Sequence, residues 1–253
     1  HLAGKAYVGE SVTDPALYYR NNVAGSLSVA EAMREAGVTN HLVFSSSCAI
    51  YRPHGRRIAE DMPKTPISPY GASKLVTEQI FADFDQAYGF PHVNLRYFNA
   101  AGSDGVIGEI HLPETHLIPL AIKAALDGEI LSVFGNDFPT PDGTAIRDYV
   151  HVSDLARAHV LALDWLLAGK PSDSFNLGTG NGYSVSEVCA AVALAIGKKV
   201  STVVLPRRPG DAPYLVCNPA KALKYLGWKA EYGLKEIADS AVKWHLSLHP
   251  VKP

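Results

Sequence analysis

The sequence has few cysteines, no excess of charge of one sign and no long hydrophobic run. Its three cysteines, Cys48, Cys189 and Cys217, are odd in number and widely spaced, which argues against a disulfide framework and a CxxC zinc site. The formal net charge of −2 provides no basic surface for nucleic acid or an anionic membrane. The longest apolar run, Cys189 to Ile196, is too short to span a bilayer. We therefore expect a cytoplasmic protein with no membrane or nucleic-acid partner.

Strand-like and helical segments alternate along the 253 residues. We predict strands over 41–47, 92–99 and 146–152 and in the segment SFNLGTG. Between them we predict helices from Pro15 to Gly37, from Pro69 to Gly89, and from a Ser153 cap to Leu167, and further helices after Ser184 and Asn218. This alternation predicts βαβ units, and so an α/β fold with a doubly wound parallel sheet.

Two of the predicted helices carry specific packing and capping signals. Val76, Ile80, Phe84 and Tyr88 recur every four residues, which predicts the apolar face of the second helix. Ser184 and Glu187 have the spacing of a capping box.

The region from 99 to 145 interrupts the alternation with glycine- and proline-containing loops, which is typical of a functional insertion. We expect residues 1–98, joined by 146–180, to form one domain. Residues 99–145 and 181–253 are expected to form a smaller α/β lobe that binds the substrate. In open α/β sheets, ligands bind beyond the carboxyl ends of the strands, and these loops follow such ends.

The stretch SPYGASK places Tyr70 four residues before Lys74, so that the two side chains are neighbours on one helical face. An ammonium, together with a cationic nicotinamide, favours the phenolate and so lowers the tyrosine pKa. A tyrosine tuned in this way can exchange a proton with a sugar hydroxyl, and Ser47 at a strand end could contact the same oxygen. A YxxxK pair alone is a weak signal, because both residue types are common on solvated helices.

Several longer stretches make the signal specific: FSSSCAIY, SPYGASK, RYFNAAG, PETHLIP, FGNDFPTPDGTAIRDYVHVSDLA, FNLGTGNGYSV and PRRPGDAP. Their order resembles that of the UDP-glucose 4-epimerase family, a group of extended short-chain dehydrogenases/reductases, across essentially the whole chain. The resemblance implies a Rossmann-like domain with a smaller lobe, and interconversion of UDP-galactose and UDP-glucose by reversible hydride transfer between sugar C4 and NAD. The opening HLAGKAYVGESV resembles the segment after the fourth strand of that domain. We therefore expect an N-terminally incomplete domain, inactive if nothing precedes it.

The resemblance also assigns roles to individual residues. Tyr70 matches the catalytic base, Lys74 the residue that holds the nicotinamide ribose, and Ser47 the hydrogen-bond partner of the reacting hydroxyl. Further matches to cofactor contacts are Leu2, Ala3, Gly4, Lys5, Ala6, Asn22 and Phe98. Matches to UDP-sugar contacts are Asn99, His116, Leu117, Ser132, Val133, Phe134, Arg147, Arg208, Asp211 and Leu215, together with Ser47 and Tyr70. The family further implies a homodimer formed through exposed Rossmann helices.

Some of these residues have simpler interpretations. Phe98 and Phe134 could be core aromatics. Arg147 could form a surface ion pair with Asp148 or Asp154, and His116 could be a wall residue. Arg207 and Arg208 could form a solvated pair, although the Pro-Gly-Asp turn beside them favours a binding loop. The ten histidines are dispersed, so we predict no metal site.

Two alternatives to the epimerase assignment stay open. A nucleotide-sugar 4,6-dehydratase or reductase would belong to the same superfamily, but its acidic pair after the strand end has no counterpart in SSSCAIY. A non-catalytic UDP-sugar-binding fragment would keep the sugar-nucleotide contacts without holding NAD. Leu215 stands where some members carry a bulky tyrosine, and we expect room there for the N-acetyl group of UDP-N-acetylhexosamines.

Overall fold

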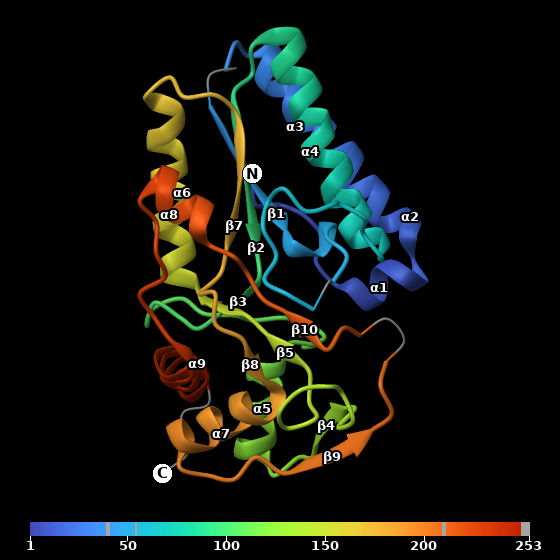
Figure 1. Ribbon diagram of the computed structural model, residues 1–253, viewed down its shortest axis with the longest axis vertical. Coiled ribbons are helices and arrows are strands. Elements are labelled where there is room, and N and C mark those ends of the chain that lie inside the picture. The colour runs from blue at the N-terminus through green and yellow to red at the C-terminus, as the bar shows by residue number, and fades with distance from the viewer. Residues whose placement is uncertain (39–40, 54, 209–210, 249–253) are drawn as a thin grey trace.

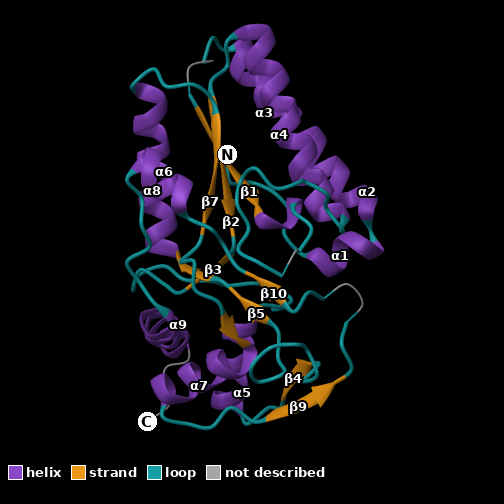
Figure 2. Ribbon diagram, viewed as in Figure 1, coloured by secondary structure: helices purple, strands orange, loops and turns teal. Residues whose placement is uncertain are grey.

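The computed structural model describes residues 1–38, 41–53, 55–208 and 211–248 (Figures 1 and 2). Its helical elements are α1 Val8–Thr13, α2 Pro15–Tyr18, the π-helical η1 Tyr19–Ala24, α3 Gly25–Glu35, the 3-10 turn η2 Cys48–Ile50, α4 Pro69–Tyr88, α5 Leu117–Asp127, α6 Val152–Leu167, α7 Val185–Ile196, α8 Ala220–Leu226 and α9 Leu234–Leu248. Its strands are β1 Leu42–Ser47, β2 His92–Tyr97, β3 Asn99–Ala101, β4 Leu131–Phe134, β5 Ile146–Arg147, β6 Tyr149–His151, β7 Asp173–Leu177, β8 Tyr183–Ser184, β9 Thr202–Leu205 and β10 Tyr214–Leu215.

The central sheet has the order β1-β2-β7, and both strand pairs are parallel. Helices α3 and α4 cover one face, and α6 and α8 cover the other (Figure 1). Phe44, Phe81 and Phe90 pack on the α4 side, whereas Phe175 and Trp228 belong to the buried cluster on the opposite side. This arrangement confirms the predicted α/β fold with helices on both faces of a parallel sheet.

The buried face of α4 is mostly polar, so the predicted apolar face is confirmed only at Ile80 and Phe84, which pack against the Phe44 cluster. Val76 and Tyr88 are exposed, and Ile80 and Phe84 are only partly covered. The face turned towards the sheet carries Gly71, Ser73, Lys74, Thr77, Glu78 and Phe81. The predicted ends of the helix are confirmed: the Ser68 hydroxyl accepts from Gly71 N–H, and Gly89 ends the helix in the left-handed conformation.

A buried ion pair fastens α4 to the sheet. Arg96 on β2 donates two hydrogen bonds to Glu78 on α4, Nε to Oε1 at 2.9 Å and Nη2 to Oε2 at 2.6 Å. Arg96 Nη1 also donates to the Tyr51 hydroxyl, which donates to Asn176 on β7. The Ser46 hydroxyl on β1 donates to the same Glu78 carboxylate. All three strands of the sheet are therefore linked through one charged network.

A second group of elements lies beyond the carboxyl ends of the central strands (Figure 1). Helices α5, α7 and α9 share one buried cluster, beside the parallel pair β4–β9 and the small sheet β10-β5-β8. The Ser184–Glu187 capping box is confirmed, with both of its hydrogen bonds formed. The predicted Ser153 cap is wrong: His151 is the cap residue of α6, and its ring Nδ1 accepts from Ser153 N–H. No helix in the described ranges combines the length and apolar composition needed to cross a membrane.

Candidate active site

The first turn of α4 lies against the loop that follows β1. A Cβ built at Gly71 would lie only 2.1 Å from the Ala49 carbonyl oxygen, so only glycine fits at this contact. Ser47 ends β1 and caps η2 by accepting from Ala49 N–H at 3.1 Å. The close approach at Gly71 therefore brings Tyr70, the preceding residue on α4, to the carboxyl end of β1.

Tyr70 and Ser47, which the sequence predicts to contact the same substrate oxygen, interact with each other in the structure. Burial raises the pKa of the Tyr70 phenol to about 12, and hydrogen bonding to the Ser47 side chain acts in the opposite direction. Among the groups of this chain burial contributes most to the shift, so the pKa moves upward, opposite to the lowering predicted for a site that also holds a cationic nicotinamide. Lowering this pKa requires positive charge brought to the ring.

Lys74 is almost fully buried under the site. Its Nζ donates to the Ser45 carbonyl oxygen at 2.8 Å and lies 4.9 Å from the centre of the Phe44 ring. Burial lowers the pKa of the ammonium to about 8, because the charged form is poorly solvated. An ammonium has three donors, and the Ser45 bond uses one of them.

The segment from Leu2 to Ala6 crosses directly above Lys74 and Asn22. A Cβ built at Gly4 would lie 3.5 Å from Lys74 Nζ and 3.2 Å from Asn22 Oδ1. The Asn22 amide accepts from Lys5 N–H at 2.8 Å and donates to Lys5 O and to Ser73 Oγ, each at 3.0 Å. Asn22 therefore fixes this backbone to α4. Leu2, Ala3, Gly4 and Ala6 stay exposed.

These residues fit a dinucleotide cofactor at the sheet edge. The cradle consists of the exposed backbone segment Leu2–Ala6, with no Cβ at Gly4, and the buried Lys74 ammonium, which has further donors besides the one used by Ser45. Such a surface is suited to ribose hydroxyls and a flat ring. The cradle lies at the carboxyl end of β1, where ligands bind in open α/β sheets.

Phe98 and Leu215 meet beside the strand end. Phe98 is buried in a cluster with Cys48, Tyr51 and Cys217, and Leu215 packs against the same cluster. Phe98 therefore packs as a core aromatic. Cys48 belongs to the same cluster and directly follows Ser47 in the chain, so the cluster adjoins Ser47. Burial raises the pKa of the Cys48 thiol to about 12, so this group is a neutral thiol at physiological pH.

The structure brings four of the predicted sugar-nucleotide residues together. The Asp211 carboxylate lies 3.6 Å from Arg147 Nη2 and accepts from Arg208 Nε at 2.9 Å. The Arg208 guanidinium stands 4.7 Å from the centre of the Phe134 ring. Arg147 is held by bonds from its Nη1 to the carbonyl oxygens of Ile146 and Ala212. Two guanidinium groups converging on one carboxylate are suited to binding a pyrophosphate.

The structure also shows which partners Arg147 and Arg207 have, so it decides between the interpretations considered for them. Arg147 faces Asp211, not the predicted Asp148, and Asp154 instead receives Arg157. Arg207 turns away from Arg208, because its guanidinium donates to Asp137 and stacks on Phe138. Most of the Pro-Gly-Asp turn lies outside the described residues.

The remaining predicted contacts lie along the edge of the second group of elements. Asn99 is on β3 and donates from its side chain to Asp148 O at 3.0 Å. Leu117 opens α5 and packs on the cluster formed by α5, α7 and α9, while Ser132 and Val133 are on β4. His116 precedes α5, is exposed, and contacts Glu109 through its ring Nδ1.

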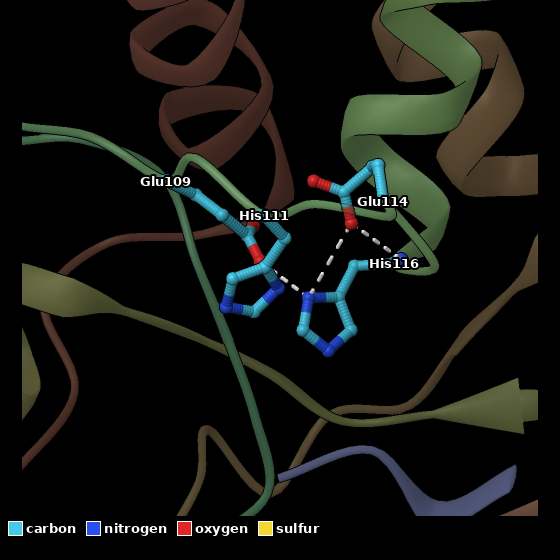
Figure 3. Close-up of side chains that lie close together, drawn as sticks. All are labelled: Glu109, His111, Glu114 and His116. Carbon is cyan, nitrogen blue, oxygen red and sulfur yellow. Dashed lines mark hydrogen bonds and ion pairs between the residues drawn. The ribbon is translucent and has the colours of Figure 1, made fainter. Parts of the chain in front are cut away.

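His116 belongs to a group of four ligand-type side chains, a pattern that the prediction of no metal site did not consider. Glu109, His111, Glu114 and His116 each offer one donor atom, and these atoms lie within 4.8 Å of one another (Figure 3). The prediction considered histidines and cysteines alone. The signal in the sequence is the repeated pattern of a glutamate two residues before a histidine, in EIHLPETH.

Residues 1–178 match the model of the NAD dependent epimerase/dehydratase family. A UDP-glucose 4-epimerase of Rhizobium leguminosarum bv. trifolii is 48% identical over 249 residues, which cover 97% of this chain and 76% of that protein. The crystal structure of UDP-glucose 4-epimerase from Brucella ovis in complex with NAD is 47% identical, with a TM-score of 0.91 and coverage of 95% of this chain and 75% of that one.

The UDP-glucose 4-epimerase from Bifidobacterium longum, solved in complex with NAD+ and UDP, is 40% identical, with a TM-score of 0.88 and coverage of 98% and 75%. These likenesses extend over both groups of elements and include the parallel sheet, so the fold is Rossmann-like. The chain therefore belongs to the NAD dependent epimerase/dehydratase family and, within it, to the UDP-glucose 4-epimerases.

Proposed function

We propose that the chain is an NAD-dependent isomerase that interconverts UDP-galactose and UDP-glucose at sugar C4 through a 4-keto sugar. The observation that carries the proposal is that Tyr70 interacts with Ser47 at the carboxyl end of β1, where the buried Lys74 also donates to the Ser45 carbonyl oxygen. We assign the central sheet with α3, α4, α6 and α8 to cofactor binding, and residues 99–145 and 181–253 other than α8 to binding of the sugar nucleotide.

In this proposal Tyr70 and Ser47 handle the proton of the sugar. Tyr70 Oη takes the proton from the C4 hydroxyl and later returns it, while Ser47 Oγ holds the same oxygen by a hydrogen bond. Lys74 orients the ribose and places positive charge beneath the site, held at the Ser45 carbonyl oxygen. The Leu2–Ala6 cradle would hold NAD, and the chemistry that NAD would supply when bound is reversible hydride transfer at C4 of the sugar.

The sugar nucleotide is proposed to be held firmly at its nucleotide end. Arg147 and Arg208 would contact the pyrophosphate, Phe134 the uracil and Asp211 a ribose hydroxyl. Arg208 and Asp211 face each other next to Phe134, which supports this assignment. His116, Asn99 and Leu117 would line the sugar end. A loosely held hexose can then present either face at C4.

The test is conversion of UDP-galactose by the purified chain with added NAD, followed by chromatography of the nucleotide sugars. We expect UDP-glucose to form with no net accumulation of NADH, because the reaction is redox-neutral. A 4-keto-6-deoxy product would favour a dehydratase instead. The neutral Cys48 thiol speaks against that reaction, since it occupies the position after the strand end where an acid is needed. Binding of UDP without turnover would favour the non-catalytic alternative.

Substitution of Leu215 should change the choice of sugar. Leu215 packs beside Phe98 and pairs with Arg147 across β10 and β5. We expect the wild-type chain to accept UDP-N-acetylgalactosamine at a rate similar to that for UDP-galactose. Leu215→Tyr should lower kcat/KM for the N-acetylated sugar by about tenfold or more while sparing UDP-galactose, because the larger ring fills the space of the acetamido group. Rejection of the N-acetylated sugar by the wild-type chain would contradict this.

We further propose a cytoplasmic homodimer that forms through α3 and α4. These helices lie side by side, and Val76, Tyr88 and Leu27 expose apolar surface on them. Val76→Arg should convert the dimer into a monomer by placing a charge in the buried interface. Light scattering after size exclusion measures the change. Val160→Arg, at an exposed valine on α6, is the control and should leave the mass unchanged.

A further inference from the structure

We propose that Glu109, His111, Glu114 and His116 form a binding site for a divalent transition-metal ion of the zinc type. The four residues lie in the loop that leads into α5, with His116 directly before that helix. The cluster does not include Tyr70 or Lys74, but it shares His116 with the proposed sugar-binding residues, so the test below measures metal binding directly.

The donor atoms are already close to the separations that a metal requires. His111 Nδ1 lies 3.2 Å from Glu109 Oε1, and His116 Nδ1 lies 3.7 Å from Glu114 Oε1. Ligands bound to zinc at about 2.0–2.2 Å in a tetrahedron lie about 3.3–3.6 Å apart. His116 Nδ1 is also in direct contact with Glu109. Two imidazole nitrogens and two carboxylates are a donor set that suits zinc.

The ring nitrogen Nδ1 of His111 provides a second observation that favours a bound cation. Its Nδ1 is shielded from solvent and makes no hydrogen bond within the described part of the chain, although the Glu109 carboxylate is near. If the group were only a set of ion pairs, this nitrogen would be expected to donate to Glu109 in good geometry. A nitrogen shielded from solvent and 3.2 Å from a carboxylate oxygen is instead suited to a cation. In Figure 3 the carboxylates and the two imidazoles turn towards one another.

The surrounding structure holds the ligands in place. Glu114 Oε1 accepts from the backbone N–H groups of Thr115 and His116, both at 2.7 Å. The Tyr7 ring stands edge-on to His111, with ring centres 5.3 Å apart, and Tyr7 Oη donates to Pro113 O.

Helix α9 fixes the other arm of the loop. Trp244 Nε1 donates to Glu109 O at 3.1 Å, and a Cβ at Gly108 would lie 2.3 Å from the Trp244 ring. Gly108 is therefore required for this packing. Contacts that orient metal ligands before the metal binds are typical of metal sites in proteins.

The experiment measures zinc binding directly, on the full chain without a histidine tag and after removal of metal by a chelator. Equilibrium dialysis against ZnCl2, followed by mass-spectrometric metal analysis, should give one zinc per chain. His111→Ala and His116→Ala should weaken this binding by about 100-fold or more, because each removes a ligand. Zinc should also raise the melting temperature of the wild-type chain but not that of the variants.

Three controls make the result decisive. Glu114→Gln keeps an oxygen that can accept from Thr115 and His116 but loses the charge, so it should fold normally and bind zinc more weakly. His41→Gln and Glu129→Gln change the same residue types elsewhere and should leave zinc binding unchanged. X-ray absorption of the zinc-loaded wild-type chain should show two imidazole ligands. Equal zinc binding by wild type, His111→Ala and His116→Ala would overturn the proposal, as would the absence of stoichiometric zinc in the wild-type chain.

Discussion

Tyr70→Phe should lower kcat for conversion of UDP-galactose by about 10²- to 10⁴-fold and leave KM nearly unchanged. The substitution removes only the hydroxyl that exchanges the proton, and general acid–base catalysis contributes effects of this size. The ring that packs edge-on against Tyr18, with ring centres 6.3 Å apart, is kept. Steady-state kinetics with the purified variant measures both constants. Tyr225→Phe on α8, an exposed tyrosine far from β1, is the control and should retain full activity. A Tyr70→Phe variant within threefold of wild type would rule out the assigned role.

The pH dependence of kcat tests the protonation state of Tyr70. The protein's own groups place the Tyr70 pKa at about 12, so the phenol would be protonated at neutral pH. Positive charge near the ring favours the phenolate, and Lys74 and the cationic nicotinamide are the proposed sources. We expect kcat to rise with pH as the phenol in the complex loses its proton. Lys74→Met removes one charge, so it should move this rise to higher pH. An unchanged profile would show that Lys74 does not tune Tyr70.

Arg96→Met should destabilise the chain by about 3–5 kcal/mol, the cost of leaving a buried carboxylate without its partner. Arg96 and Glu78 are 3% and 6% exposed, so water cannot replace the lost guanidinium. Urea unfolding monitored by fluorescence gives the free energy of unfolding.

The double variant Arg96→Met/Glu78→Leu separates the cost of an unpaired buried carboxylate from the net contribution of the ion pair to stability. Removing both charges should recover most of the stability, since replacing a buried ion pair with apolar groups of similar size is often close to neutral. Lys235→Met breaks an exposed pair with Asp239 and should leave the free energy of unfolding nearly unchanged. A loss at Arg96 as small as the loss at Lys235 would show that the pair does not hold α4.

The order of strands and helices could be predicted because local signals determine it. Gly89 and the Ser184–Glu187 box mark helix ends by their own backbone and side-chain chemistry, and the structure has each where it was expected. The cap of α6 was mispredicted because serine is a commoner cap residue than histidine. In the structure the His151 ring accepts the hydrogen bond that a serine hydroxyl would otherwise accept.

The buried face of α4 could not be predicted from hydrophobic spacing. The rule assumes that the apolar stripe faces the core, whereas here Lys74, Thr77 and Glu78 are buried because they find partners on other segments, such as Ser45 and Arg96. The direction of the Tyr70 pKa shift was missed for the same reason, since burial depends on the packing of η2 against α4. The cluster around His116 brings a loop into contact with α9 and Tyr7, contacts that no local pattern specifies.

The polar attachment of α4 also determines how α4 can move. Apolar side chains can slide past one another and pack again with little loss, so a helix held by them alone could shift along a sheet by a turn. The fork of hydrogen bonds between Arg96 and Glu78 has one orientation and no equivalent one turn away. Helix α4 is therefore locked both in rotation and in axial position. Tyr70, the proposed proton-exchanging residue in the first turn of α4, therefore keeps its distance from the end of β1 through each catalytic cycle.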